Sequence, residues 1–190
     1  LAHYGFNDEL PVVLVVGGSL GTRTLNEMMK AWVRDLDGVA PVQVIWQTGK
    51  YYEREMQEFL RSHPTKNIWQ GAFIERMDYA YAAADVVLSR SGACTVSELC
   101  LVAKPTIFVP SPNVAEDHQT KNAMALVEQG AAEIVRDSEA VERGMHLAVE
   151  LSRNGRRLEE LSSNIAKLAI SDSADRVVRV IDEVLTEVKR

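Results

Sequence analysis

Cysteine is scarce in this chain of 190 residues, which contains only Cys94 and Cys100. The two form no CxxC pair and lie near no histidine cluster, so the sequence indicates neither a disulfide framework nor a structural zinc site. It also contains no HExxH or DxD motif, and we expect no metal ion and no cofactor. So little cysteine fits a reducing compartment, and we expect a cytoplasmic protein.

Long apolar runs and an excess of positive charge are missing too. Every apolar stretch is shorter than the roughly 18 residues that span a bilayer, and no basic segment leads into a signal-like stretch. The chain has 21 Lys and Arg against 27 Asp and Glu, a net charge of −6. This balance argues against a broad nucleic-acid surface, so we expect no nucleic-acid partner. Because the chain begins with Leu1 and not Met, we expect it to be a piece of something longer.

Short apolar runs alternate with segments of helical periodicity. The run Val12 to Val16, between Pro11 and the segment GGSLGT, is typical of a buried strand that leads into a glycine-rich turn. Strands are predicted at 12–16, 42–47, 67–70, 85–89, 106–109 and 131–135. Helices are predicted at 22–33, 50–60, 77–84, 95–102 and 118–128, with three more pieces after Asp137. This alternation predicts an α/β fold, a Rossmann-like parallel six-stranded sheet with helices on both faces, in one domain over residues 1–190.

The final helix, within residues 172–190, carries one apolar stripe formed by Val177, Val178, Ile181, Val184, Leu185 and Val188. A stripe of this kind most often packs against the sheet of its own domain. The alternative is a helix that reaches out to cover a partner domain.

Three segments that follow predicted strands are candidates for a binding site, because open parallel sheets bind ligands at the carboxyl ends of their strands. The first is Gly17 to Thr22 (GGSLGT). Its glycines permit a tight turn, and the amides at the start of the next helix favour an anion such as phosphate. The segment matches neither the Walker A pattern nor GxGxxG, and the glycines could serve only close helix–strand packing.

The second segment is Ser89 to Leu99 (SRSGACTVSEL), in which small residues lead into a helix start near Cys94 and Thr95. Glu98 lies about one helical turn beyond Thr95, and its carboxylate suits the two hydroxyls of a ribose or sugar. The same spacing also fits a capping box, with Thr95 as N-cap and Glu98 at the third helical position.

The third segment is Val109 to Ala123, where Asp117, His118, Gln119 and Asn122 crowd a helix start. Amides and a carboxylate in this arrangement are typical of carbohydrate recognition. Asp117 could instead be a simple N-cap, and His118 is either a general base or a structural residue. Two anion-binding helix starts and a polar loop together indicate a nucleotide sugar or a related diphosphate as ligand.

Five blocks in order, GGSLG, GAFIERM, SRSGACTVSEL, KPTIFVPSP and DHQTKNA with EQGAA, resemble the C-terminal half of the MurG family between Val12 and Val135. The resemblance implies one half of a GT-B glycosyltransferase that binds UDP-GlcNAc as donor. The implied reaction is an inverting, metal-independent transfer of GlcNAc to lipid-linked MurNAc-pentapeptide, which converts lipid I to lipid II in peptidoglycan biosynthesis. No catalytic residue is expected in this piece, because the family's general base belongs to its N-terminal domain.

The resemblance also places the donor on particular residues. Phe73 and Ile74 would pair with uracil through backbone atoms, and Glu98 would hold the ribose. The diphosphate would lie between the glycine turn and the second helix start, and the sugar against the third segment. The expected donor-binding residues are Gly18, Ser19, Gly21, Phe73, Ile74, Arg90, Ser91, Gly92, Ala93, Cys94, Thr95, Glu98, His118, Gln119 and Asn122.

Three positions depart from the family pattern. Leu20 replaces the usual Gln, Thr22 replaces Ala, and Ala103 stands where a glycine is usual. The family's acceptor-binding N-terminal domain, with the patch that sits on the cytoplasmic face of the inner membrane, has no counterpart here. In the family the last helix crosses back to that domain, and a piece without it is expected to bind donor but not to turn over.

Two other functions stay open. The chain also resembles the donor subunit of the two-subunit GlcNAc transferase that acts on dolichol pyrophosphate. It could also be a non-catalytic sensor of nucleotide sugars.

Overall fold

The strands lie where aliphatic and β-branched residues run together. In the computed structural model, which describes residues 1–113 and 115–188, every residue of β1 and β4 is buried. Buried strands of this kind are covered by helices on both faces. The six strands are β1 (Val12–Val16), β2 (Val39–Gln47), β3 (Lys66–Gly71), β4 (Val86–Ser89), β5 (Thr106–Phe108) and β6 (Glu133–Ile134).

The strands form one sheet in the order β3-β2-β1-β4-β5-β6, and all neighbouring pairs are parallel. The predicted six-stranded parallel sheet is thus confirmed. The chain adds β2 and β3 on one side of β1, and then returns to place β4 on the other side. The strand order therefore reverses between β1 and β4, where a ligand crevice is expected at the carboxyl ends.

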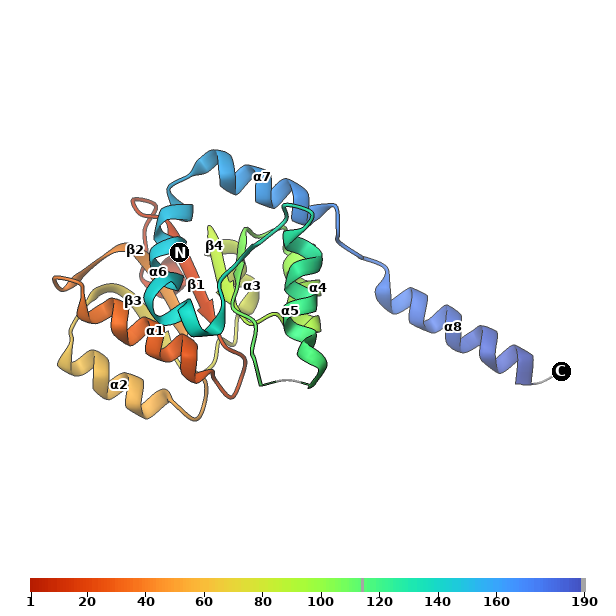
Figure 1. The fold of residues 1–190 in the computed structure, drawn as a ribbon, viewed down its shortest axis with the longest axis horizontal. Helices are drawn as coiled ribbons and strands as arrows, with labels where there is room; N and C mark the ends of the chain where they lie inside the picture. Colours follow the sequence, from red (N-terminus) through yellow and green to blue (C-terminus); the bar gives the residue numbers. More distant parts are fainter. Residues whose placement is uncertain (114, 189–190) are drawn as a thin grey trace.

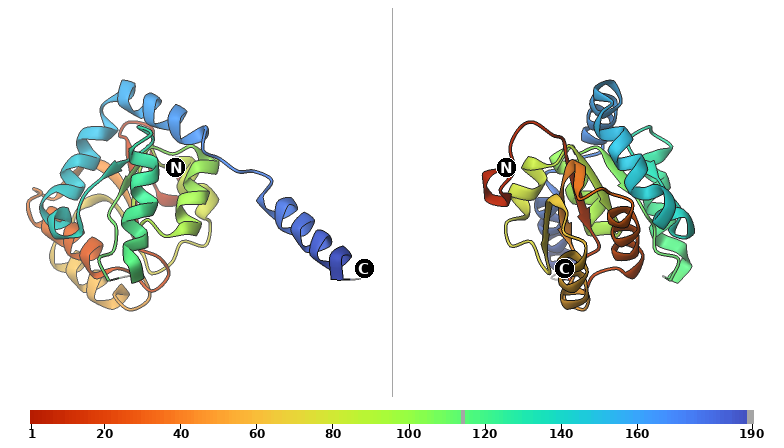
Figure 2. Two further views of the ribbon diagram at one scale, coloured as in Figure 1. Left: turned by 45° about the vertical axis from the view of Figure 1, so that its right-hand side comes forward. Right: turned by 90° about the vertical axis from the view of Figure 1, so that its left-hand side faces the viewer.

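Helices cover both faces of this sheet (Figures 1 and 2). One core contains side chains from α1, α2 and α6, and the other contains side chains from α3, α4 and α5. The helices are α1 (Arg23–Arg34), α2 (Glu53–Ser62), α3 (Met77–Ala83), α4 (Ala93–Val102), α5 (His118–Val127), α6 (Ala140–Ser152), α7 (Gly155–Ala166) and α8 (Ser173–Val188). Three short 3₁₀ helices, η1 (Ala2–Tyr4), η2 (Ala115–Asp117) and η3 (Asp137–Glu139), complete the described elements.

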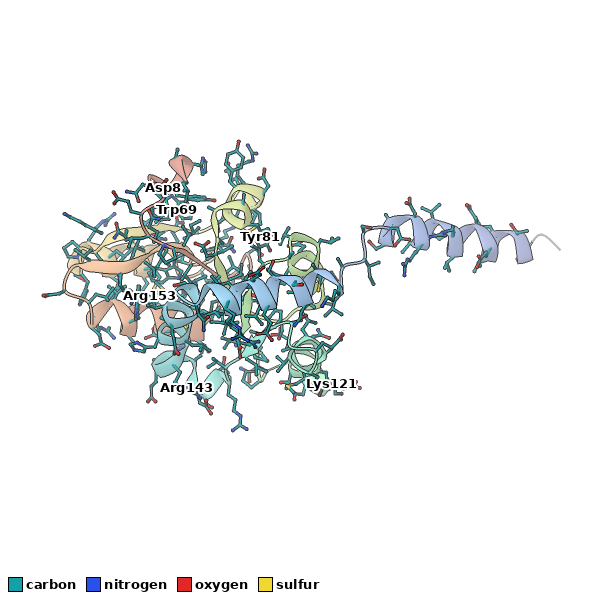
Figure 3. The ribbon with its side chains drawn as sticks, turned by 90° about the horizontal axis from the view of Figure 1, so that it is seen from above. Asp8, Trp69, Tyr81, Lys121, Arg143 and Arg153 are labelled. Carbon is teal, nitrogen blue, oxygen red and sulfur yellow. The ribbon has the colours of Figure 1, made fainter. Side chains whose placement is uncertain are left out.

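Helix α8 does not pack against the sheet, so the more common expectation for its apolar stripe is wrong for this chain. The helix extends away from the rest of the molecule (Figures 1 and 3). Its apolar side chains from Val177 to Leu185 are each 51–59% exposed. The side chain of Val188 and residues 189–190, also part of the predicted helix, lie outside the described residues. Within the described residues, no helix is both long and apolar enough to cross a membrane.

Helix α4 ends in a backbone conformation that favours glycine. Its C-cap residue, Ala103, has φ 53° and ψ 37°, in the left-handed region. The Ala103 carbonyl accepts a hydrogen bond of 2.8 Å from Ser162 Oγ on α7. A Cβ in this conformation is strained by about 1–2 kcal/mol, which the packing of α4 and α7 must offset.

We expect Ala103→Gly to raise the free energy of unfolding by about 0.5–1 kcal/mol, because relief of strain exceeds the added entropy of the unfolded chain. Urea denaturation measures the change. Ala125→Gly is the matched control, since Ala125 is exposed on α5 and has no positive φ. That substitution is expected to lower stability by about 0.5–1 kcal/mol. A loss of stability in both variants would contradict the strain at Ala103.

Candidate functional site

A crevice of about 470 Å³ lies at the carboxyl ends of β1 and β4, where the strand order reverses. Its walls are the turn after β1, the start of α4 and the loop after β5. Seven of the residues predicted for the site line it, namely Gly18, Gly21, Arg90, Gly92, Thr95, Glu98 and Gln119. The structure thus brings together parts of all three candidate segments.

The turn after β1 combines the two roles considered for its glycines. Gly18 and Gly21 have φ of +84° and +87°, which residues with a Cβ rarely adopt. A Cβ on Gly21 would also collide with the Thr48 carbonyl oxygen, so this glycine permits close packing. Thr22 Oγ1 donates to the Gly17 carbonyl oxygen at 2.8 Å and closes the turn. Gly18 has open space beside it, so a ligand can approach the backbone there.

Helix α4 begins two residues earlier than predicted, at Ala93, with Gly92 as its N-cap. Thr95 is therefore the third helical residue, and the capping-box interpretation of Thr95 and Glu98 is wrong. No side chain caps this helix, so the amides of Ala93, Cys94 and Thr95 lie at an uncapped helix start. Helix α1 also starts without a side-chain cap. Two helix N-termini with positive partial charge therefore flank the crevice.

Glu98 lines the crevice and is exposed. Its carboxylate accepts a 3.1 Å hydrogen bond from Tyr81 Oη. Burial and the nearby Glu98 charge together raise the pKa of Tyr81, so the phenol stays protonated and keeps donating. This bond orients the carboxylate in the crevice and leaves lone pairs for other donors.

Three residues predicted at the site connect α4 to α5. Ser91 is fully buried, and its Oγ donates to the Gln119 carbonyl oxygen at 2.8 Å. Asn122 Nδ2 donates to the Ser91 carbonyl oxygen at 3.1 Å, and Gln119 Oε1 accepts from the Ser111 amide at 2.9 Å. These hydrogen bonds therefore join the starts of α4 and α5, a structural role that does not depend on a ligand.

Arg90 is held by protein groups. Its guanidinium donates to the carbonyl oxygens of Val109 (2.8 Å) and Pro110 (3.1 Å). It also lies 2.5 Å from Asp137 Oδ1, as an ion pair rather than an aligned hydrogen bond. Asp137 in turn accepts from Thr24 Oγ1 at 3.1 Å. Arg90 and Asp137 thus connect the start of α1 to the loop after β5.

Phe73 and Ile74 lie beside a smaller cavity of about 200 Å³, next to η1. Phe73 is 58% exposed and Ile74 is buried. The Ile74 amide already donates to Gln47 Oε1 at 3.1 Å. Pairing of a base with this segment stays a prediction, and a base that contacts the Ile74 amide would have to share it with Gln47.

The third segment opens with an unusual backbone. Asp117 occupies the N-cap of α5 with φ 52°, yet its carboxylate accepts from Thr120 Oγ1 at 2.6 Å and from no helix amide. The expected capping bond from Asp117 is therefore absent among the described residues. His118, the first residue of α5, is exposed, while Val114 in the preceding loop lies outside the described residues.

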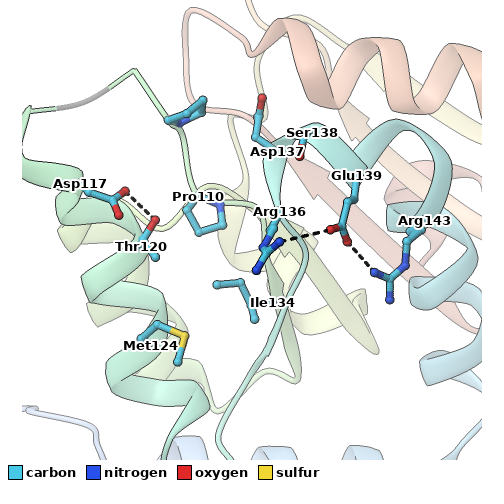
Figure 4. A pocket seen from close by; sticks show the side chains of 11 residues that line it. Pro110, Asp117, Thr120, Met124, Ile134, Arg136, Asp137, Ser138, Glu139 and Arg143 are labelled. Atoms are coloured by element: carbon cyan, nitrogen blue, oxygen red, sulfur yellow. Dashed lines mark hydrogen bonds and ion pairs between the residues drawn. The ribbon is translucent and has the colours of Figure 1, made fainter.

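A larger cavity of about 860 Å³ lies between the start of α5 and η3 (Figure 4). The apolar side chains of Pro110, Met124 and Ile134 line part of it. At its rim, Glu139 pairs with both Arg136 and Arg143. The cavity adjoins the crevice through Asp137, which lines both.

Sequence reasoning missed several side chains that line the crevice, among them Arg23, Gln47, Tyr81 and Asp137. Arg23 was detectable, because it directly follows the glycine turn and so belongs to the first helical turn. Gln47 ends β2, and the sequence does not state that β2 lies beside β1. Asp137 lies at the start of η3, which follows β6 at the edge of the sheet. Among the described residues, no group of three or more His, Cys, Asp or Glu is arranged to hold a metal ion.

Comparison with known proteins now decides the family. Residues 12–177 match the model of the glycosyltransferase family 28 C-terminal domain. The chain belongs to this family. The matched residues extend from β1 to the beginning of α8, so the family model covers all six strands of the sheet.

Two curated relatives of this family 28 domain share one enzyme name. The chain is 48% identical over 187 residues to the UDP-N-acetylglucosamine–N-acetylmuramyl-(pentapeptide) pyrophosphoryl-undecaprenol N-acetylglucosamine transferase of Parabacteroides distasonis, covering 97% of this chain and 50% of the relative. The same-named protein of Porphyromonas gingivalis is 48% identical over 195 residues, covering 100% and 50%. The chain therefore spans about half the length of the curated relatives that it matches.

Solved structures agree with this family assignment. MurG of Acinetobacter baumannii superimposes with a TM-score of 0.77 at 30% identity, over 92% of this chain and 52% of that protein. The calicheamicin glycosyltransferase CalG4 superimposes with a TM-score of 0.71 at 18% identity, over 96% and 45%, and so supports the fold alone.

Substitution of Arg90 and of Arg23 tests which of these two crevice arginines stabilises the fold. We expect Arg90→Met to lower the free energy of unfolding by about 2 kcal/mol, since it leaves the Asp137 carboxylate without its cationic partner and two carbonyl groups without their donor. Arg23 is exposed and forms no ion pair within the described residues, so Arg23→Met is expected to change stability by less than about 0.5 kcal/mol. Chemical denaturation of both variants measures the difference. Equal losses would contradict the structural role of Arg90.

Proposed function

We propose that this domain binds UDP-GlcNAc as the donor half of a glycosyltransferase. The observation that carries the proposal is the meeting of two uncapped helix starts, α1 and α4, across one crevice beside Glu98. Backbone amides at two helix N-termini suit a diphosphate, and a carboxylate beside them suits ribose hydroxyls. The name shared by the curated relatives supports the choice of donor.

The diphosphate is proposed to lie between Gly18–Gly21 and the first turn of α4. Arg23 adds a cation at this place, and Arg90 does not, because Asp137 neutralises it. As the bond to the sugar breaks, negative charge builds up on the leaving UDP, and the α4 dipole stabilises it there.

The two ends of the donor are proposed to lie on opposite sides of the diphosphate. The uracil would contact the backbone of Phe73 and Ile74, with Glu98 holding the ribose. Gln119 and Asn122, with His118, would contact the GlcNAc hydroxyls. Gln119 lines the crevice, and all three belong to the first turns of α5, which supports this placement.

The full reaction is proposed to need the half of the relatives that this chain does not cover. In that reaction an acceptor hydroxyl of lipid-linked MurNAc-pentapeptide attacks the anomeric carbon from the face opposite UDP, with inversion. The general base and the acceptor site would belong to the N-terminal domain, at the cytoplasmic face of the inner membrane. Helix α8 would cross back to that domain, and its exposed apolar side chains support this role.

Calorimetric titration of the 190-residue chain tests donor binding. We expect UDP and UDP-GlcNAc to bind, and UDP-GalNAc to bind several-fold more weakly, because its axial hydroxyl leaves polar groups near α5 unpaired. Absence of binding at millimolar UDP would contradict the proposal.

The ribose role of Glu98 has its own test. We expect Glu98→Ala to weaken UDP binding by about 1–3 kcal/mol, through lost hydrogen bonds to the ribose. With 2′-deoxy-UDP, which offers one hydroxyl fewer, the penalty should fall to about half. Tyr81→Phe, which only frees the carboxylate, should cause a smaller loss. An unchanged UDP affinity in Glu98→Ala would rule out the ribose contact.

A further inference from the structure

Gln47 is a buried polar side chain whose hydrogen bonds join two separate walls of the crevice. It is the last residue of β2 and is 4% exposed. Its Nε2 donates to the Gly18 carbonyl oxygen at 2.9 Å, and its Oε1 accepts from the Ile74 amide at 3.1 Å. Both ends of one primary amide are thus used to bridge the glycine turn and the segment after β3.

We propose that Gln47 is a positioning residue that fixes the spacing between the diphosphate subsite and the nucleobase subsite. The inference rests on the proposed function, which places the diphosphate at Gly18 and the base at Phe73 and Ile74. In the described residues no other side chain bonds to both segments.

The turn itself has other supports, so Gln47 is not needed merely to form it. The Lys50 amide donates to the Ser19 carbonyl oxygen at 3.1 Å, and Thr22 closes the turn on Gly17. Gly21 also packs closely against Thr48. The same loop also reaches the segment after β3, because the Gly49 amide donates to the Ala72 carbonyl oxygen at 3.1 Å. Gln47 adds the one side-chain bridge among the described residues that joins Gly18 directly to Ile74.

A fixed spacing affects a ligand that occupies both subsites more than a ligand that occupies one. A rigid site binds the linked ligand with one loss of translational and rotational freedom, whereas a site with variable spacing must also be ordered on binding. UDP occupies both subsites, while uridine and inorganic pyrophosphate each occupy one. Loss of the bridge therefore predicts weaker UDP binding with little change for the two fragments.

Gln47→Met keeps the length of the side chain and removes both hydrogen bonds. We expect its dissociation constant for UDP to rise about tenfold, while those for uridine and pyrophosphate stay within about threefold of the unsubstituted chain. Uridine is expected to bind about as well as before, because it occupies only the nucleobase subsite and does not depend on the spacing between the two subsites. NMR titration with each of the three ligands measures these constants.

Gln43→Met is the matched control. Gln43 also lies on β2, is 3% exposed and bridges two residues, accepting from the Asn7 amide and donating to the carbonyl oxygens of Asn7 and Leu10. It lies in the middle of β2, beside Val12 at the start of β1, and does not line the crevice. Its loss should lower the denaturation midpoint as Gln47→Met does, with UDP binding unchanged.

Gln47→Asn is a second variant in case Gln47→Met does not fold. Its amide is one methylene too short to reach both neighbours, so we again expect weaker UDP binding with little change for uridine and pyrophosphate. An equal weakening of UDP, uridine and pyrophosphate would overturn the proposal, and so would unchanged UDP binding in both Gln47 variants. If the unsubstituted chain binds neither UDP nor uridine, it is the proposed function that fails.

Discussion

The reversal of strand order between β1 and β4 is the constraint on which the site depends. Because both strands point the same way, each delivers its following helix to the same edge of the sheet. Because the chain turns outward in opposite directions from this pair, the two helices cover opposite faces and leave a gap between their starts. The crevice, its uncapped amides and its neighbouring loops all follow from that one topological step.

An acidic protein can hold an acidic ligand when local dipoles outweigh net charge. The chain carries a net charge of −6, yet the crevice offers amides from two helix starts and the guanidinium of Arg23. Helix-end fields act within about one turn, whereas surface carboxylates elsewhere are screened over about 8–10 Å at physiological salt. Glu98 can therefore lie in the same crevice, because its partners are neutral donors such as the Tyr81 phenol.

The sequence predicted the centre of the sheet well because β1 and β4 are short runs of mainly apolar residues, a signal that depends on local residues alone. The uncapped start of α4 was harder. Thr95 and Glu98 have the spacing of a capping box, but Gly92 adopts an extended conformation and starts the helix earlier. A spacing rule cannot register that shift, because the first turn is set by how the chain leaves β4.

The polar residues near α5 were predicted as a group, but their individual bonds were not. Ser91 donates to the Gln119 carbonyl oxygen and Asn122 donates to the Ser91 carbonyl oxygen, and these partners lie 28 and 31 positions apart in the chain. No sequence pattern indicated Gln47, because its two hydrogen-bond partners come within reach only when β1, β2 and β3 lie side by side. Contacts of this kind are consequences of topology, and single-residue patterns do not contain them.

The rest of the described molecule does not depend on contacts with helix α8. Within the part of the chain that the structure describes, no residue beyond Leu168 belongs to either core or to the crevice. Within the described residues, the crevice and the apolar face of α8 are therefore separate, connected through the segment around Ile170. Substitutions on the apolar face of α8 can therefore change what this helix contacts without disturbing the crevice, and substitutions in the crevice leave that face unchanged.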